Sequence, residues 1–215
     1  MNNPVKEILV IGLGLIGSSI AIASRAKGIV VHGFDIDESS VNKAIENNII
    51  DKSFSSIEEI NNKDLIGKVD LIIVSVSPKN TQDVINNLDI LWNSEITITD
   101  TSSVKNHLSF KESSNIILSH PIAGSDRSGV DAGTEGLFIG KKNVICNPFD
   151  ADQFHVDRLK DFWTHALQMR VSEMSVKEHD ILFAVTSHLP HLISYALIDS
   201  IRLSATDVDD NAGAG

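Results

Sequence analysis

The feature that most constrains the fold is a glycine-rich turn, Gly12-Leu13-Gly14-Leu15-Ile16-Gly17, which directly follows an apolar run from Ile8 to Ile11. The residues after it favour a helix that Gly28 ends. In such a unit the first glycine permits the tight turn, the second admits a pyrophosphate, and the third lets helix and strand pack closely. The helix N-terminus attracts the phosphates. We therefore expect this turn, including Leu15 and Ile16, to bind a dinucleotide; a merely structural glycine turn is the alternative.

An acidic residue stands where the ribose of such a cofactor is recognised. Asp35 directly follows a second apolar run, Val30 to Phe34, and lies 18 positions after Gly17. A carboxylate there accepts hydrogen bonds from the ribose hydroxyls and repels a 2′-phosphate. Because no Lys or Arg follows Asp35 before Lys43, the sequence favours NAD over NADP as the cofactor.

Short β-branched runs alternate with longer helical stretches, which is typical of repeated βα units. A helical stretch from Asp152 to Ala166, with Phe154, Leu159 and Phe162 on one face, separates the last two strands. The sequence predicts an α/β fold for residues 1–174, a Rossmann-like, doubly wound and mainly parallel sheet. The expected strands lie at 8–11, 30–34, 69–76, 96–99, 115–119, 143–147 and 170–174.

Residues from Val176 to Leu203 predict a long helix that contains one proline, Pro190. Its broad apolar stripe needs another helix to cover it. We expect residues 175–215 to begin a second, helical domain that a partner subunit completes or that is incomplete in this chain, with a loop at 209–215. The stripe consists of Ile181, Val185, Leu189, Leu192, Ala196 and Leu197.

Composition excludes several classes of protein. The 29 acidic residues exceed the 18 basic ones, so the net charge of -11 gives no basic surface for a nucleic acid. No apolar run approaches the roughly 20 residues of a membrane span, and the polar start is unlike a signal peptide. We therefore expect a cytoplasmic protein without nucleic acid or membrane partners. The single cysteine, Cys146, allows no internal disulfide and is expected to be a small buried residue on a strand.

Polar residues follow three of the expected strands, at the sheet edge where open α/β folds bind ligands. Ser75 lies at the end of one of them, Ser77 and Pro78 follow it, and all three are predicted to contact the cofactor; an ordinary helix start capped by Asn80 or Thr81 is also compatible. Ser103 follows another. It is suited to hydrogen-bond a reacting hydroxyl or a carboxamide, or simply to cap a helix.

The third strand end, Ser119 to Gly129, contains His120, whose imidazole is matched near neutral pH to accept a hydroxyl proton as hydride leaves carbon. A capping or core histidine is the alternative. Two further histidines, His188 and His191, are three residues apart on the long helix and can face one way. No third ligand is evident, so we expect no metal. Pro190 frees a backbone carbonyl or kinks the helix there.

Taken together, these residues resemble the prephenate and arogenate dehydrogenase family. The resemblance rests on GLGLIGSS at 12–19, FDID at 34–37, TDTSSVK at 99–105, SHPIAGSDRSG at 119–129, and EHD with SHLPH between 178 and 191. It implies that His120 is catalytic and bonds the ring hydroxyl, and that Ser103 assists it. It further implies a substrate site formed by His188, His191, Ser125 and Asp126.

The same resemblance implies an NAD-dependent oxidative decarboxylation in tyrosine biosynthesis, which converts prephenate to 4-hydroxyphenylpyruvate or arogenate to tyrosine, in a homodimer joined by the helical domain. The family's basic segment that binds the ring carboxylate would follow Gly215, which leaves Arg127, Lys105 or Lys141 as substitutes. The alternatives are another NAD-dependent hydroxyacid dehydrogenase and a truncated, catalytically impaired NAD-binding protein. A short-chain dehydrogenase is disfavoured because Asp199, not a lysine, follows Tyr195 by four residues.

Overall fold

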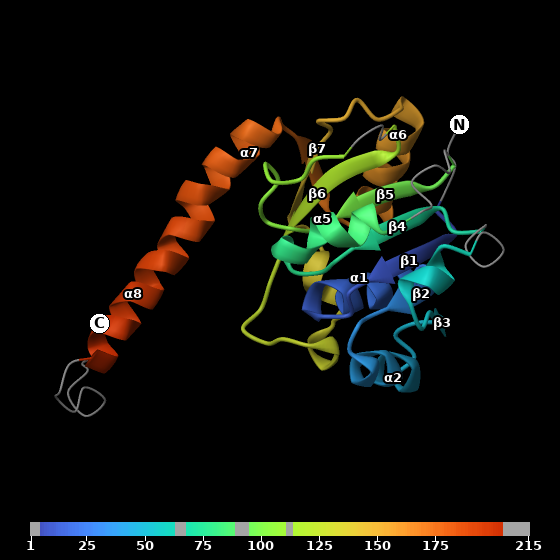
Figure 1. Cartoon of the computed structure of the whole chain (residues 1–215), viewed down its shortest axis with the longest axis horizontal. Helices are drawn as coiled ribbons and strands as arrows, with labels where there is room; N and C mark the ends of the chain where they lie inside the picture. Colours follow the sequence, from blue (N-terminus) through green and yellow to red (C-terminus); the bar gives the residue numbers. More distant parts are fainter. Residues whose placement is uncertain (1–4, 63–67, 89–94, 111–113, 204–215) are drawn as a thin grey trace.

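The computed structural model describes residues 5–62, 68–88, 95–110 and 114–203. Within them, one eight-stranded sheet has the order β3-β2-β1-β4-β5-β6-β7-β8 (Figure 1). All neighbouring strands are parallel except β6 and β7, which are antiparallel. The predicted Rossmann-like, mainly parallel sheet is confirmed. The expected loop at 209–215 lies outside the described residues.

The strands match the seven predicted ones within a few residues at each end. The additional strand, β3, is two residues long and polar, so it gives no apolar run to recognise. The strands are β1 (Glu7–Ile11), β2 (Val30–Phe34), β3 (Lys52–Ser53), β4 (Leu71–Val74), β5 (Thr97–Asp100), β6 (Ile116–Ile122), β7 (Lys142–Cys146) and β8 (Arg170–Glu173).

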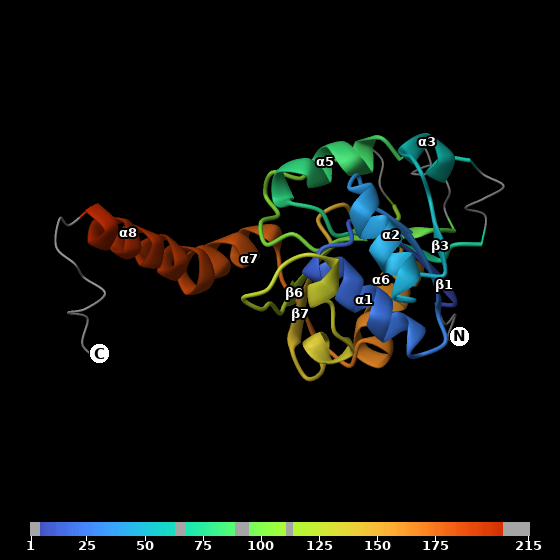
Figure 2. The ribbon, with the colours of Figure 1, turned by 90° about the horizontal axis from the view of Figure 1, so that it is seen from below.

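Helices cover both faces of the sheet, because side chains of each strand point alternately to either side. Ile8 and Val10 face a cluster that includes residues of α1 (Leu15–Arg25), α2 (Glu38–Glu46) and α6 (Gln153–Asp161). Leu9 and Ile11 face a second cluster with α3 (Ile57–Ile60), α5 (Pro78–Asn86) and α7 (Val176–Phe183). Figure 2 shows α3 and α5 on one side of the molecule and α1 and α6 toward the other. The free thiol of Cys146 is buried in β7, as expected.

The helical stretch predicted at 152–166 forms, and it ends in a π-helical turn, η4 (Phe162–Ala166). Leu159 and Phe162 are buried, but Phe154 is exposed, so the three side chains are not all part of the core. Its ring instead packs under the guanidinium of Arg158, 4.4 Å from the ring centroid. This cation–π contact stabilises the aromatic ring at the surface.

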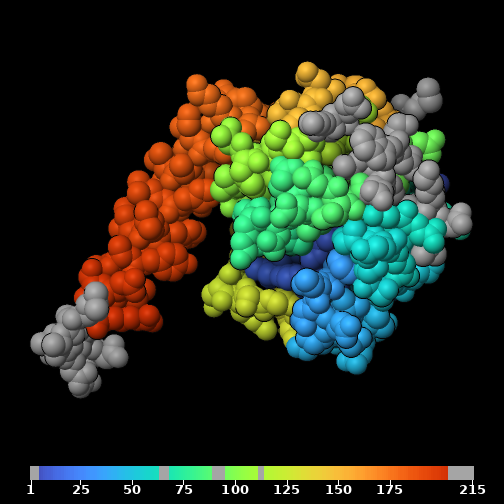
Figure 3. Space-filling model, in the orientation of Figure 1, coloured from blue at the N-terminus to red at the C-terminus, as the bar shows by residue number. Residues whose placement is uncertain are grey.

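The C-terminal helical segment projects away from the sheet (Figures 1 and 3). It comprises α7, a π-helical turn η5 (Ala184–His188) and α8 (Leu189–Leu203). The first turns pack on the sheet through His179 and Phe183, which are buried. Beyond them the predicted stripe is exposed, since no described element covers it: Ile181, Val185, Leu189, Leu192 and Leu197 all belong to the exposed large hydrophobic residues.

By length and composition alone, the helix from Val176 to Arg202 meets the requirements of a membrane span, with a mean hydropathy of 1.5 over its most apolar stretch. The prediction that no segment of the chain reaches that length is therefore wrong. The helix is nevertheless anchored to the folded sheet by its first two turns, and its apolar residues equally suit a contact between helices.

Candidate active site at the carboxyl edge of the sheet

The glycine turn is tightly enclosed by protein on one side and open on the other. Gly12 has φ +95, and a Cβ built on it would lie 2.5 Å from the carbonyl oxygen of Ser75. A Cβ on Gly17 would lie 1.8 Å from the carbonyl oxygen of Gly12. At Gly14, the N-cap of α1, a Cβ would meet nothing within 4 Å. The turn therefore has open space at the position where a pyrophosphate must approach the backbone.

Asp35 lies against this turn at the end of β2. Its Oδ2 accepts a hydrogen bond from the backbone N–H of Leu13 at 2.6 Å, and its Oδ1 accepts one from the N–H of Asp37 at 2.9 Å. Each carboxylate oxygen retains lone pairs for further donors. The first turn of α1 contains no acidic residue and no side chain caps it, so its N–H groups are available to phosphates. These residues fit a dinucleotide with free ribose hydroxyls.

The segment after β4 borders the same turn. The carbonyl of Ser75 contacts Gly12, as described above, and the Ser75 hydroxyl accepts a hydrogen bond from that of Thr101 at 3.1 Å. Helix α5 starts with Pro78 at its first position and Ser77 as its N-cap residue. The alternative that Asn80 or Thr81 caps this helix is wrong, because Thr81 lies inside it and its hydroxyl donates to the Ser77 carbonyl at 3.3 Å.

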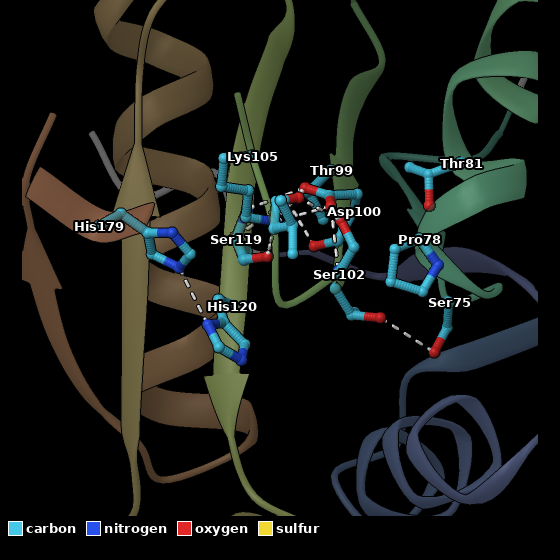
Figure 4. Close-up of polar contacts among 12 residues, drawn as sticks. Ser75, Pro78, Thr81, Thr99, Asp100, Ser102, Lys105, Ser119, His120 and His179 are labelled. Carbon is cyan, nitrogen blue, oxygen red and sulfur yellow. Dashed lines mark hydrogen bonds and ion pairs between the residues drawn. The ribbon is translucent and has the colours of Figure 1, made fainter. Parts of the chain in front are cut away.

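A buried ion pair joins β5 and β6 beyond the last residues that they pair. The register of these parallel strands ends with Thr99 opposite Ile117. Past that point, the Ser119 N–H donates to Asp100 Oδ1 at 3.2 Å, and the Ser119 carbonyl accepts from Lys105 Nζ. Lys105 Nζ also binds both Asp100 oxygens, at 2.8 and 2.6 Å, and both side chains are completely buried (Figure 4). Immediately before His120, the side chains of Asp100 and Lys105 thus take the place of backbone hydrogen bonds between β5 and β6.

This ion pair overturns one prediction. Lys105 is not available as a cation for a substrate carboxylate, since its ammonium is buried and already bound to Asp100. The sequence contained a signal for the pair: Asp100 ends an apolar strand, and a buried carboxylate requires a partner, for which Lys105 is the nearest lysine. Arg127 and Lys141 are exposed.

Ser103 lies partly buried in the loop after β5. No helix follows it in the described stretch up to residue 110, so the alternative that it caps a helix is wrong. The loop is instead held by Asp180 of α7, whose carboxylate accepts hydrogen bonds from the N–H of Lys105 at 3.0 Å and that of Asn106 at 2.8 Å. Ser103 is thereby fixed relative to the first helix of the C-terminal segment.

His120 lies in β6 and contacts α7 through a second histidine. Its Nδ1 is 2.9 Å from Nε2 of His179 (Figure 4). Its ring packs edge-on against Phe183, with the centroids 4.7 Å apart. Burial, together with the positive charge of Lys105, lowers the pKa of His120 to about 3. The imidazole is therefore neutral near pH 7 and able to accept a proton.

His179 is a functional residue that the motifs did not predict. It is completely buried, and its Nδ1 is 2.7 Å from Oδ1 of Asp180. Burial lowers the pKa of His179 below its usual value, although the bond to Asp180 opposes this effect. The signal that could have identified it is the capping box of Ser175 and Glu178, which fixes the start of α7. His179 follows directly and occupies a buried position of the first turns.

His188 and His191 lie further along the projecting helix. Both line an open groove of about 540 Å³ with Ala184, Leu189, Leu192 and Tyr195. Nε2 of His188 is buried without a hydrogen-bond partner, and His188 is close enough to His120 to affect its pKa. His191 is exposed, and no described contact joins it to His120. Among the described residues, no group of three His, Cys, Asp or Glu side chains is placed to hold a metal ion.

Ser125 and Asp126 lie in the exposed loop after β6. The Ser125 hydroxyl accepts a hydrogen bond from the N–H of Arg127 at 2.9 Å, which shapes the loop. No described contact links either side chain to His120. The structure thus brings together the turn, Asp35 and Ser75 in one group and Ser119, His120 and His179 in a second. Ser125, Asp126 and His191 lie on exposed segments.

Comparison with known proteins gives two family matches. Residues 20–171 match the model described as "Prephenate dehydrogenase, nucleotide-binding domain", and residues 175–212 match "Prephenate dehydrogenase, dimerization domain". The chain is 31% identical over 210 residues to a cyclohexadienyl dehydrogenase of Zymomonas mobilis, covering 91% of this chain and 67% of that protein. It is 30% identical to a prephenate dehydrogenase of Bacillus subtilis, covering 92% of this chain and 54% of that protein. The chain therefore spans little more than half of the latter relative.

Solved structures agree with these matches. A prephenate dehydrogenase from Aquifex aeolicus, in complex with hydroxyphenyl propionate and NAD+, superposes with a TM-score of 0.84 at 28% identity, covering 96% of this chain and 73% of that one. An arogenate dehydrogenase from Synechocystis gives a TM-score of 0.78 at 25% identity, covering 97% and 76%. The family matches, the sequence relatives and the shared fold lead to one conclusion: this chain belongs to the prephenate dehydrogenase family of oxidoreductases.

Proposed function

We propose that this protein catalyses the NAD-dependent oxidative decarboxylation of prephenate or arogenate, as a step of tyrosine biosynthesis. The observation that carries the proposal is the environment of His120. It is an imidazole at the carboxyl edge of the sheet that is unprotonated near neutral pH, and its Nδ1 is bound to His179. A dehydrogenase acting on a hydroxyl needs such a proton acceptor.

The cofactor proposal is supported by the glycine turn and Asp35. Gly12, Gly14, Leu15, Ile16 and Gly17 would hold the pyrophosphate, with Ser75, Ser77 and Pro78 on the opposite side of the turn. Asp35, anchored by Leu13 and Asp37, would accept hydrogen bonds from the ribose hydroxyls. Its negative charge disfavours a 2′-phosphate, which supports NAD over NADP.

In the proposed reaction, His120 accepts the proton of the ring hydroxyl as hydride leaves the carbon that bears it. NAD+, when bound, supplies the hydride acceptor. Loss of carbon dioxide leaves its bonding electrons in the ring, which becomes aromatic, and the new phenol oxygen takes a proton back. Since aromatisation favours the forward direction, this chain has mainly to position the substrate and to hold His120 neutral.

We propose that Ser103 assists His120 and that His188, His191, Ser125 and Asp126 form the substrate site. Support comes from the groove that His188 and His191 line and from the unpartnered Nε2 of His188. The domain boundary is proposed near residue 174, between the two matched family regions, which end at 171 and start at 175.

We further propose that the protein is a cytoplasmic homodimer joined by the helix from Val176 to Leu203. The match of this segment to a dimerization domain and its exposed apolar residues support a subunit contact rather than a membrane span. Replacing Leu192 and Leu197 with Glu is expected to give monomers in sedimentation equilibrium. The control is Ile139→Glu, another exposed apolar residue on the sheet domain, which should leave the mass unchanged. A wild-type monomer would contradict the dimer.

The reaction is tested by following NADH formation with prephenate and with arogenate. We expect turnover with at least one of them, and we expect His120→Asn to remove most of the rate while NAD affinity, measured by calorimetry, stays nearly intact. His165→Asn, which changes an exposed histidine of η4, serves as the control. NAD binding without turnover on either substrate would favour the impaired NAD-binding protein, and an unchanged rate in His120→Asn would contradict the assigned role.

A further inference from the structure

We propose that His179 and Asp180 are positioning residues that fix the tautomer of His120, so that its Nε2 carries the free lone pair. This inference rests on the proposed function and adds to it the two residues that make His120 a proton acceptor at one particular nitrogen.

Asp180 determines the first hydrogen bond of the series. Its carboxylate accepts from the backbone N–H groups of Lys105 and Asn106, at 3.0 and 2.8 Å. Burial raises the pKa of this carboxyl, but the hydrogen bonds from His179, Asn106 and Lys105 outweigh it, so the pKa lies below its ordinary value. An ionised carboxylate has no proton to donate. The 2.7 Å contact must therefore be donated by Nδ1–H of His179.

The second hydrogen bond follows from the first. A neutral imidazole carries one N–H, and that of His179 is on Nδ1. Its Nε2 is then an acceptor, so the 2.9 Å contact is donated by Nδ1–H of His120. With its single proton on Nδ1, His120 has an unprotonated Nε2. The reversed arrangement would need a positively charged His179, which complete burial next to the Lys105 ammonium opposes.

The two positioning residues also join separate parts of the site. His120 belongs to β6, the loop that carries Ser103 follows β5, and His179 and Asp180 start the helix that continues into the groove with His188 and His191. Asp180 contacts that loop directly and His120 through His179. The arrangement parallels the buried aspartate that orients the histidine of serine protease triads, although here a second histidine stands between them.

The test is Asp180→Asn. With its oxygen in the place of Oδ2, the amide still accepts from the N–H of Asn106, at 2.8 Å, and from that of Lys105, at 3.3 Å. Its NH₂ group then takes the place of Oδ1 and lies toward His179. His179 would then accept at Nδ1 and donate from Nε2, which forces the proton of His120 onto Nε2. We expect kcat to fall by a factor on the order of 10² to 10⁴, as for the analogous aspartate change in triads. NAD affinity should change less than about twofold, since the glycine turn and Asp35 are untouched, and KM should change far less than kcat.

A direct readout does not depend on activity. Two-bond ¹H–¹⁵N correlation spectra distinguish protonated from unprotonated ring nitrogens. We expect His120 to be protonated on Nδ1 in the wild type and on Nε2 in Asp180→Asn. The control is Glu178→Gln, an equal loss of charge on the same helix at a carboxylate that bonds Ser175 instead of His179; it should leave both kcat and the His120 tautomer unchanged.

The outcomes separate the two levels of proposal. A wild-type His120 protonated on Nε2 overturns the inference whether or not the variant folds, as does an Asp180→Asn protein with unchanged tautomer and kcat. If neither prephenate nor arogenate is turned over while the wild-type spectrum shows Nδ1–H, the proposed function fails and the assignment of the tautomer stands.

Discussion

Gly17 and Gly12 are in contact through their backbones: a Cβ on Gly17 would lie 1.8 Å from the Gly12 carbonyl oxygen. No real side chain tolerates that distance, so the third glycine of the turn is required by packing and independently of any ligand. Gly14, between them, has open space around its missing Cβ. The two positions therefore separate the structural from the ligand-binding role of the motif.

We expect Gly17→Ala to destabilise the protein by about 3 kcal/mol or more, because backbone atoms must shift. Gly14→Ala should keep the unfolding midpoint of the wild type yet weaken NAD binding at least about tenfold, or ~1.4 kcal/mol, since the methyl group occupies the space for the pyrophosphate. Thermal unfolding and calorimetric titration measure the two effects. Unaltered NAD affinity in a folded Gly14→Ala protein would argue against binding at this turn.

Asp35→Ser is expected to weaken NAD binding and to reduce the difference in affinity between NAD and NADP. The reason is that the carboxylate that would accept hydrogen bonds from the ribose hydroxyls is lost. The matched control is Asp37→Ser, two residues away. The Asp37 carboxylate caps α2 by accepting hydrogen bonds from the N–H groups of Ser39 and Ser40. The control substitution therefore removes one negative charge, as Asp35→Ser does, but from a residue that is not assigned to the cofactor. The measurement is the ratio of the dissociation constants for NADP and NAD in each variant. If both variants changed this ratio equally, the overall negative charge, and not Asp35 itself, would set the preference for NAD.

Breaking the buried pair should be costly. Lys105→Met leaves the Asp100 carboxylate buried without its cation and is expected to cost about 3–5 kcal/mol in urea denaturation. Adding Asp100→Asn should recover part of this loss, since the unpaired charge is removed. The control is Lys160→Met: the pair of Lys160 with Glu173 is partly exposed, and its loss should cost less than about 1 kcal/mol. A Lys105→Met protein of wild-type stability would contradict the assignment.

The pH dependence of stability follows from His120. Its pKa is about 3 in the folded protein and ordinarily 6.5, so between these values the unfolded chain binds more protons and stability rises with pH. The charged or titratable groups that act on it are Lys105, His179, His188 and Asp180. Lowering the pH from 7 to 5 should lower the thermal midpoint of the wild type more than that of His120→Asn. The exposed histidine variant His165→Asn should follow the wild type, and parallel curves for all three would refute the shift.

The sheet could be predicted because its strands are apolar runs separated by helices, and this pattern can be recognised in the sequence without knowing any tertiary contact. The antiparallel direction of β7 could not, because strand direction depends on the path of the connection from Ile122 to Lys142, which packs Val130 and Phe138 into the core. The face of α6 was predicted in part: Leu159 and Phe162 are buried, whereas Phe154 packs on Arg158 at the surface.

The candidate site divides in the same way. The glycine turn, Asp35 and His120 are recognisable because their roles follow from their place directly after a strand. The contact of His179 with His120 could not be predicted, because the two residues are 59 positions apart in the chain. The Asp100 carboxylate calls for a cation such as Lys105, but its bond to the Ser119 N–H forms where β5 and β6 no longer pair, and the pattern does not show that point. Contacts of this kind are tertiary, and local periodicity does not report them.

The π-helical turn from Ala184 to His188 has a geometric consequence for the projecting helix. One extra residue in a turn rotates everything after it by about 100° relative to a regular α-helix, which has 3.6 residues per turn. The face of α7 that contacts His120 and the apolar face of α8 are therefore not aligned as they would be on one regular helix. A single helical wheel drawn for residues 176–203 would misplace one face relative to the other. Removing one residue there would leave α7 seated on the sheet while turning the apolar side of α8 to a new direction.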